Sequence, residues 1–293
     1  MIEHDAHTRT LRLHDGRRLA WTEWGDETGA PLVYLHGTPG SRYERHYDPN
    51  VYSEAGVRAI VPDRPGYGLS DRQPGRTLLD HAQDIAQLAD HLGLGRFAML
   101  GNSGGGPFAI ACGYALPERV TAVGVMSGVG RLDLPGAKEH VPFSDVVLYG
   151  MATYAPRVMD LSVRALAWLA RARPDFVMER FAHSLSTSDR MQMARKELVE
   201  LFQLVFTEAF RRGARATVED YAIFRKPWGF ALTDVELPVF FWHGAEDTMV
   251  TLGQAQMLAT GLPNARLTVY PGEGHFLFPE HAPEILATLR DAT

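Results

Sequence analysis

The feature that most restricts the fold of this chain is the regular alternation of apolar runs with helical patterns. Six runs are apolar throughout, rather than at every second position, which suits strands covered on both faces, as in a parallel sheet. Helix-like stretches separate most of them, an order that is typical of an α/β fold with crossover helices. The apolar runs cover residues 31–35, 57–61, 97–100, 120–126, 238–242 and 267–270, and the helical stretches cover residues 78–92, 107–116, 252–262 and 279–289.

The beginning of the chain predicts an antiparallel hairpin. Segments 11–13 and 17–24 alternate apolar with polar residues and flank Asp15 and Gly16, a dipeptide that favours a tight hairpin turn. Together with the six apolar runs, the hairpin predicts a mostly parallel, twisted sheet of about eight strands flanked by helices.

One long segment interrupts the alternation. Between residues 131 and 232 the chain has helical patterns rich in Met, Trp, Phe and Arg, and no convincing buried strand. Such a stretch is too long for a loop and too helical to be disordered. We therefore expect a helical cap or lid at 131–232, inserted after the sixth strand between the two parts of a core domain, 1–130 and 233–293.

Charge, hydropathy and cysteine content exclude several classes of protein. The 29 basic and 35 acidic residues leave a net charge of −6, which argues against a nucleic-acid or anionic-membrane partner. No apolar stretch approaches the roughly 18–20 residues that cross a bilayer, and residues 1–10 lack the apolar segment of a signal peptide. The single cysteine, Cys112, excludes a disulfide within the chain. We expect a cytoplasmic monomer or homodimer that acts on a small molecule.

A serine lies at the junction of one predicted strand and the helix that follows it. Residues 101–105 read Gly-Asn-Ser-Gly-Gly, a G-x-S-x-G pentapeptide between the apolar run 97–100 and the helical stretch 107–116. In this context a serine occupies a sharp strand-to-helix turn with a strained backbone and an exposed hydroxyl. The flanking glycines fit because a Cβ would crowd the turn. Ser103 is therefore the candidate nucleophile.

Polar residues that follow the other predicted strands should gather near Ser103, because an open parallel sheet binds ligands beyond the carboxyl ends of its strands. A serine hydroxyl needs a base to accept its proton, and His275 follows the last predicted strand in a glycine-rich loop. Asp247 would orient the imidazole and stabilise the imidazolium, and Glu246 is the next candidate acid. His243 ends its own strand just before this loop, and we interpret it as structural.

Acyl transfer also needs N–H donors for the oxyanion that develops in the reaction. Gly104 supplies one, since it follows the nucleophile at the start of a helix whose dipole favours negative charge. We expect the second from the loop after the first apolar run and select Thr38, because the neighbouring Pro39 has no N–H.

Five pieces of the sequence resemble the α/β-hydrolase superfamily, over essentially the full length of the chain. Ser103, Asp247 and His275 also follow its chain order of nucleophile, acid and base. The resemblance implies a catalytic triad that needs no metal or organic cofactor, and it adds Asp133 as a further candidate acid, because some hydrolases of this fold place the acid there. The five pieces are His36-Gly37-Thr38-Pro39-Gly40, Asp63-Arg64-Pro65-Gly66-Tyr67-Gly68-Leu69-Ser70, Gly101-Asn102-Ser103-Gly104-Gly105, Gly244-Ala245-Glu246-Asp247 and Gly274-His275-Phe276.

Two local patterns carry further expectations. Many members of the superfamily have a larger residue at the position of Gly104, so we expect space beside Ser103 that admits a bulky acyl group or is filled from the cap. In the cap, arginines recur every seven residues, and we interpret them as a solvated helix face with an apolar face buried behind it. The alternative is a basic rim that attracts an anionic substrate. The arginines are Arg157, Arg164 and Arg171, and the residues expected to be buried are Val158, Leu161, Ala165, Trp168 and Leu169.

These observations predict a serine hydrolase that cleaves a carboxylic ester or thioester of a small to medium, fairly apolar substrate. Hydrolysis of a lactone or an amide, hydrolysis of a C–C bond, and perhydrolysis use the same three residues and stay open. Asn102, directly before the nucleophile, occurs in some C–C hydrolases of the superfamily. A non-catalytic ligand receptor is the alternative from another class, although a pure binder has no need of an aligned base and acid.

Overall fold

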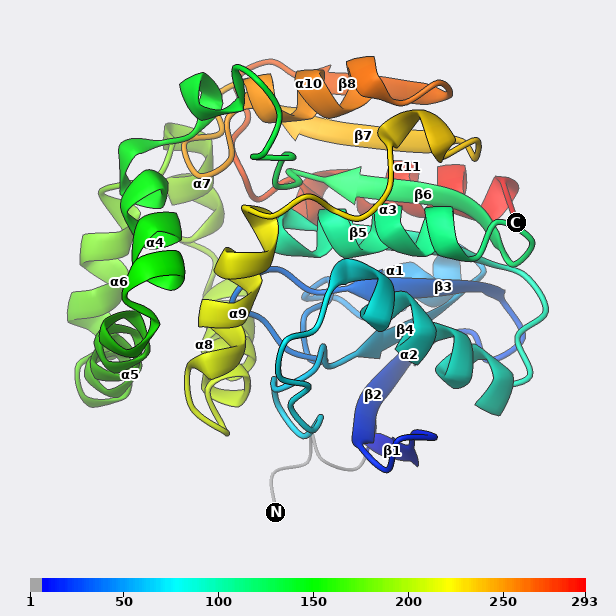
Figure 1. Ribbon diagram of the computed structural model, residues 1–293, viewed down its shortest axis with the longest axis horizontal. Helices are drawn as coiled ribbons and strands as arrows, with labels where there is room; N and C mark the ends of the chain where they lie inside the picture. Colours follow the sequence, from blue (N-terminus) through cyan, green and yellow to red (C-terminus); the bar gives the residue numbers. More distant parts are fainter. Residues whose placement is uncertain (1–6) are drawn as a thin grey trace.

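An eight-stranded sheet, in the order β1-β2-β4-β3-β5-β6-β7-β8, forms the centre of the protein (Figure 1). The computed structural model describes residues 7–293. Most of residues 1–10, the segment that we expect to lack a signal peptide, therefore lies outside the described residues. From β4 to β8 every neighbouring pair is parallel, which confirms the predicted sheet. The strands are β1 (Arg9–Arg12), β2 (Arg18–Gly25), β3 (Ala30–Leu35), β4 (Val57–Pro62), β5 (Phe97–Asn102), β6 (Val120–Met126), β7 (Val239–Gly244) and β8 (Ala265–Tyr270).

The predicted hairpin forms the antiparallel edge of the sheet. Strands β1 and β2 pair from Arg9↔Trp21 to Arg12↔Arg18, and β2 continues antiparallel to β4. Gly16 has a φ of +86° in the connecting turn, a conformation that a glycine adopts without steric cost. The hairpin prediction is confirmed.

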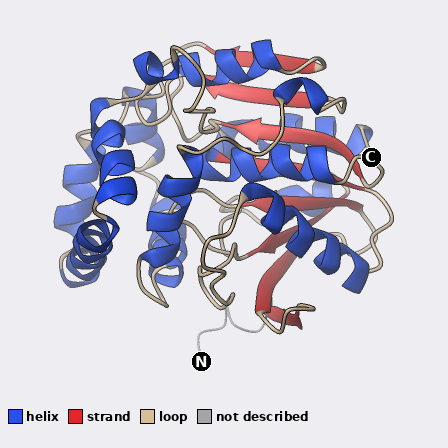
Figure 2. Cartoon of the chain, in the orientation of Figure 1, coloured by secondary structure: helices blue, strands red, loops and turns tan. Residues whose placement is uncertain are grey.

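Helices cover both faces of the sheet (Figure 2). Alternate residues of the central strands pack into two separate cores. In β3, Val33 and Leu35 pack with α2, α3 and α10, whereas Leu32 and Tyr34 pack with α1 and α11. This two-sided burial explains why the central strands are apolar at every position. The helices are α1 (Asn50–Glu54), which was not predicted, α2 (Leu78–His91), α3 (Gly106–Ala115), α10 (Leu252–Gly261) and α11 (Phe278–Asp291).

Six helices follow one another between β6 and β7. Figure 1 shows them beyond the carboxyl ends of the strands, with α8 and α9 nearer the sheet than α4, α5 and α6. Within residues 7–293, no helix has the length and apolar character needed to cross a bilayer. The six are α4 (Phe143–Tyr154), α5 (Pro156–Ala172), α6 (Pro174–Ala182), α7 (Thr187–Gln192), α8 (Lys196–Ala209) and α9 (Arg215–Phe224).

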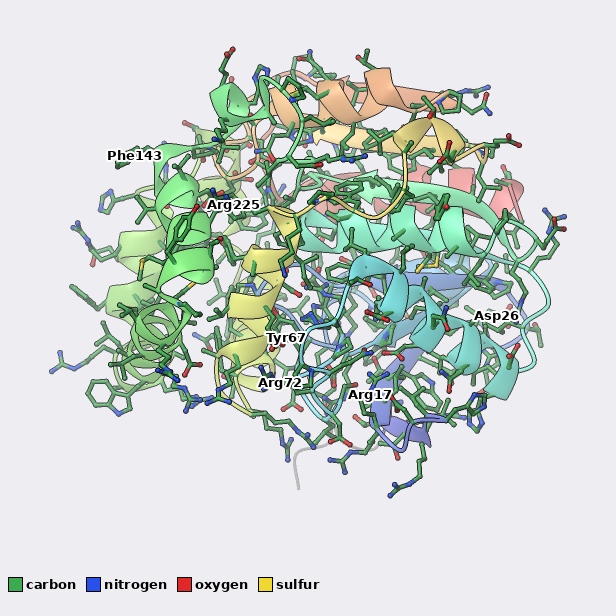
Figure 3. The ribbon with its side chains drawn as sticks, viewed as in Figure 1. Arg17, Asp26, Tyr67, Arg72, Phe143 and Arg225 are labelled. Atoms are coloured by element: carbon green, nitrogen blue, oxygen red, sulfur yellow. The ribbon has the colours of Figure 1, made fainter. Side chains whose placement is uncertain are left out.

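The expected burial of one face of α5 was wrong. Val158, Leu161 and Trp168 have exposed fractions of 57%, 70% and 68%, and the helix is buried only at Met159 and Ala167. The reason is that α5 lies on the outer side of the helical segment, where α4, α6 and α9 contact it along a narrow stripe. The pattern of α5 therefore predicted an amphipathic helix correctly, but tertiary packing leaves much of its apolar face uncovered, as it does Phe143 at the start of α4 (Figure 3).

Candidate active site

Ser103 lies directly after β5, at the start of a short 3-10 turn that leads into α3. Its φ is +51°, a left-handed conformation that costs free energy in a residue with a Cβ and is held by the surrounding structure. The neighbouring glycines make this turn possible: a Cβ on Gly101 would lie 2.6 Å from the Gly105 carbonyl oxygen, and one on Gly105 would lie 2.2 Å from the Leu35 carbonyl oxygen. The strained strand-to-helix turn expected from the pentapeptide is present.

Asp247 and His275 meet from the loops after β7 and β8. The Nδ1 atom of His275 donates to Oδ2 of Asp247 at 2.8 Å, and both residues are at least 94% buried. The other oxygen, Oδ1, accepts the backbone N–H groups of Met249 and Val250 at 2.8 and 2.9 Å. These bonds use both carboxylate oxygens, so Asp247 is held in one orientation toward the imidazole.

A cavity connects the serine to this histidine. Ser103 and His275 both line it, together with Gly37 and Thr38 from the loop after β3. The opposite wall comes mainly from α8, whose apolar residues recur at intervals of three and four and so share one helix face. The residues of α8 in this wall are Leu198, Leu201, Phe202, Val205 and Phe206.

A sequence profile of the family described as alpha/beta hydrolase fold matches residues 30–282. The chain belongs to this family. Among curated relatives, it is 29% identical to a 2-hydroxy-6-oxononadienedioate/2-hydroxy-6-oxononatrienedioate hydrolase of Burkholderia vietnamiensis, over 86% of this chain and 82% of that one. It is 27% identical to a non-heme chloroperoxidase of Streptomyces lividans, over 94% of this chain and 96% of that one.

Solved structures agree with this assignment at the level of the fold. An esterase from Exiguobacterium antarcticum superimposes with a TM-score of 0.71 at 20% identity, covering 96% of this chain and 97% of the esterase. An enzyme described as degrading N-acyl homoserine lactones superimposes with a TM-score of 0.68 at 22% identity, covering 97% and 99%. The protein is a hydrolase of the α/β hydrolase fold family.

The other candidate acids of this hydrolase have other surroundings, and the candidate base His243 lies beside Asp247, with its Nε2 3.5 Å from Oδ2 of that carboxylate. Glu246 is exposed, and Asp133 pairs with Arg131 at 2.9 Å. His243 donates through Nε2 to the carbonyl oxygen of Val250 at 2.8 Å, as expected of a structural histidine. Of the three acids considered from the sequence, Asp247 is the one hydrogen-bonded to His275.

The pKa values of Asp247 and His275 are shifted in opposite directions by their surroundings. Burial alone would raise the pKa of Asp247, but His275 outweighs it and holds that pKa below its usual value. Burial alone would lower the pKa of His275, and the carboxylates of Asp247, Asp189 and Glu44 outweigh it, so that pKa lies above its usual value. Both shifts favour the ion pair that a proton transfer to His275 would create.

Side chains of the protein fill the space beside Ser103, so this space does not form a wider acyl pocket. A Cβ on Gly104 would lie 2.3 Å from Oγ1 of Thr38, 2.7 Å from Cβ of Thr38 and 3.0 Å from Cζ of Phe224 on α9. Of the two expectations for this position, the wider acyl pocket is therefore wrong. The filling comes from the loop after β3 and from the helical segment, so position 104 is restricted to glycine by residues distant in the chain.

Asp220, on α9, was missed by the sequence analysis and forms the centre of a buried network. Its Oδ2 accepts from Oγ1 of Thr38 at 2.8 Å and from Nη2 of Arg64 at 2.8 Å, and its Oδ1 accepts from Nη2 of Arg76 at 2.6 Å. The hydroxyl of Tyr67, labelled in Figure 3, donates to Oδ2 at 2.9 Å. Asp220 thus links the loop that carries Thr38 to the helical segment beyond the carboxyl ends of the strands.

Glu44 is a second residue that the sequence analysis missed. Its carboxyl group lines the cavity and accepts from Nδ2 of Asn102 at 2.9 Å and from the N–H of Gly37 at 3.0 Å. Burial raises its pKa above the usual value. A carboxyl group therefore lines the same cavity as Ser103 and holds the side chain of Asn102, the residue before it.

Within residues 7–293, no group of three or more His, Cys, Asp or Glu side chains is arranged to hold a metal ion. The acidic and imidazole groups near Ser103 are instead paired with one another or with backbone donors, as Asp247 and His275 are. The arrangement suits proton transfer along a chain from a hydroxyl to an imidazole that a carboxylate orients.

Proposed function

We propose that this hydrolase cleaves a carboxylic ester or thioester of a small to medium, fairly apolar substrate through an acyl-enzyme. Ser103 is the nucleophile, His275 the general base and then general acid, and Asp247 the residue that orients His275. The backbone N–H groups of Gly104 and Thr38 form the oxyanion hole. Residues 131–232 act as a cap that covers the site.

The reaction follows from these roles. Oγ of Ser103 attacks the carbonyl carbon while Nε2 of His275 takes its proton, and the oxyanion of the tetrahedral intermediate is stabilised by the two N–H donors. Collapse of the intermediate breaks the bond to the leaving alcohol or thiol, which receives the proton from His275. Water then loses a proton to His275 and attacks the acyl-enzyme, which releases the acid and restores Ser103.

The observation that carries the proposal is the hydrogen bond to Asp247 from His275, which lines the same cavity as Ser103. A carboxylate that is fixed by two backbone N–H groups and bonded to an imidazole beside a strained serine suits nucleophilic catalysis. The apolar face of α8 supports an apolar acyl or alcohol group, because burial of such a group against it is favourable.

Hydrolysis of a C–C bond is the second candidate, because curated relatives carry that kind of name and Asn102 precedes the nucleophile. The substrates named for those relatives are dicarboxylates. In this chain the cavity that Ser103 lines also holds the carboxyl of Glu44. Arg45, the one guanidinium among the described cavity residues, lies over the Trp24 ring at 4.4 Å and donates to the carbonyl oxygens of His46 and Tyr47. This charge pattern favours a neutral ester.

The proposal is tested with a fluorophosphonate probe and a series of p-nitrophenyl esters of increasing acyl length. We expect labelling of the native protein and a loss of turnover of roughly 10⁴–10⁶ in Ser103→Ala. Ser53→Ala, a change at an exposed serine, serves as the matched control and should keep both labelling and turnover. Normal ester hydrolysis by Ser103→Ala would refute the assignment, and turnover of a dienoic dicarboxylate with no ester turnover would favour C–C cleavage.

A further inference from the structure

The backbone of His275 is held by side chains. The loop between β8 and α11 has no ladder of backbone hydrogen bonds, so its N–H and C=O groups need other partners. The N–H of His275 donates to Oδ2 of Asp189 at 2.9 Å, and the N–H of Phe276 donates to Oδ1 of the same carboxylate at 2.9 Å. The carbonyl oxygen of His275 accepts from Oγ of Ser127 at 3.1 Å.

Asp189 comes from α7 in the helical segment, and its carboxylate is fixed by its own helix. The hydroxyl of Ser186, the residue before that helix, accepts from the N–H of Asp189 at 3.1 Å and donates to Oδ2 at 2.9 Å. Asp189 has an exposed fraction of 1%. A buried carboxylate with both oxygens bonded has little freedom to turn, so it can hold two consecutive N–H groups in place.

Gly274, the residue before His275, packs against the same carboxylate of Asp189. A Cβ on Gly274 would lie 2.1 Å from Oδ2 of Asp189 and 2.2 Å from Oγ of Ser186. These distances are far below van der Waals contact, so a side chain at position 274 and the carboxylate of Asp189 exclude each other. The closely packed helical segment is thus the reason why this motif needs a glycine.

We propose that Asp189 is a positioning residue for His275: it binds the backbone N–H groups on both sides of the Cα of His275 and presents a negative charge to the imidazole. The proposal rests on the function proposed above, in which His275 is the base. Asp189 is absent from the described residues that line the cavity, so it acts through His275 and not on the substrate.

Charged and titratable groups from five elements act on His275. They are Asp189 from α7, Asp145 from α4, Glu44 from the loop after β3, His243 from β7 and Asp247 from the loop after it. Burial lowers the pKa of His275, and Asp247, Asp189 and Glu44 raise it. Removal of the charge of Asp189 therefore lowers that pKa. Because His275 must be neutral to accept a proton, activity would then persist to lower pH.

Two substitutions separate the hydrogen bonds of Asp189 from its charge. Asp189→Ala removes both acceptors, whereas Asp189→Asn keeps one acceptor oxygen and a similar size. We expect kcat to fall about 10- to 100-fold in Asp189→Ala and less in Asp189→Asn, with KM unchanged in both, because misplacement of a catalytic group acts on the chemical step. The acid limb of kcat/KM should move to lower pH by the same amount in both variants.

Glu208→Gln is the matched control. Glu208 is also a buried carboxylate of the helical segment, and it accepts from Nη1 of Arg42 at 2.6 Å, away from the loop of His275. The change should lower the unfolding temperature while leaving kcat and the acid limb in place. Gly274→Ala should reproduce the fall in kcat of Asp189→Ala, because its Cβ displaces the carboxylate from the same two N–H groups.

Two readouts do not depend on turnover. In a Ser103→Ala background, an NMR titration should give a lower pKa for His275 when Asp189 is replaced by Asn. Amide hydrogen exchange of His275 and Phe276 should become faster. Native kcat, native acid limb and native exchange in a folded Asp189→Asn protein would overturn the proposal. If Ser103→Ala kept its turnover, the proposed function would fail instead, while the titration and exchange data would still report on Asp189.

Discussion

Replacement of Asp220 by Asn offers a direct test of how the helical segment is attached to the sheet. The carboxylate has no solvent exposure and bonds the guanidinium groups of Arg64 and Arg76, which are 0% and 3% exposed. Asn has nearly the same size but no charge. The substitution therefore leaves two buried cations facing a neutral amide, with little change in packing.

The expected size of the effect follows from this burial. Removal of one partner from a buried ion pair costs about 3–5 kcal/mol, because the remaining charge stays desolvated and uncompensated. For a chain of this length, 1 kcal/mol corresponds to about 2 °C in the unfolding midpoint, so the midpoint should fall by roughly 6–10 °C. Exposed pairs behave differently, and Asp90→Asn, which removes a partner of Arg119 on the surface, should cost at most about 1 kcal/mol.

Urea unfolding of the native protein, Asp220→Asn and Asp90→Asn measures both costs. Burial raises the pKa of Asp220, but Arg64 and Arg76 outweigh it and hold the pKa below its usual value. The contribution of Asp220 is therefore complete above the unfolded pKa of about 3.9 and is lost as the pH falls through the lower folded value. The difference between native protein and Asp220→Asn should be constant from about pH 8 to pH 5 and shrink below pH 4. A loss no larger than that of Asp90→Asn would refute the reasoning.

Three further outcomes are expected. Gly104→Ala should lower kcat/KM about 10²- to 10³-fold, because its Cβ would collide with Thr38 and displace both proposed oxyanion donors; activity near the native level would contradict this. Asp247→Asn should lower kcat by about 10⁴, since an amide fails to select the tautomer of His275 that accepts the proton from serine; steady-state kinetics across pH measures it. Phe202→Ala, which opens the cavity wall, should lower kcat/KM about 2- to 10-fold for esters with an aromatic acyl group and less for acetyl esters.

The strands and the strand-to-helix turn were predictable because their signals are local. A run that is apolar at nearly every position reports burial on both faces, as β6 shows, where all seven residues are buried. The pentapeptide around Ser103 reports a turn that needs glycine on both sides, because a Cβ on Gly101 or Gly105 would clash with a backbone carbonyl oxygen. His275 and Asp247 could be selected because the ends of parallel strands meet at one edge of the sheet.

The contacts of the helical segment depend on packing that no local pattern encodes. Asp189 and His275 are 86 residues apart, and Arg64 and Asp220 are 156 residues apart, so each acid looks like an ordinary helix residue in the sequence. The same holds for α5, whose apolar period predicts a face without saying whether another element covers it. Local patterns along the chain were enough to predict the sheet, the turn at Ser103 and the chain order of the polar residues. The carboxylates that hold the loops of these polar residues emerge only from the packed fold, because a carboxylate stays buried only where the fold brings donors to both of its oxygens.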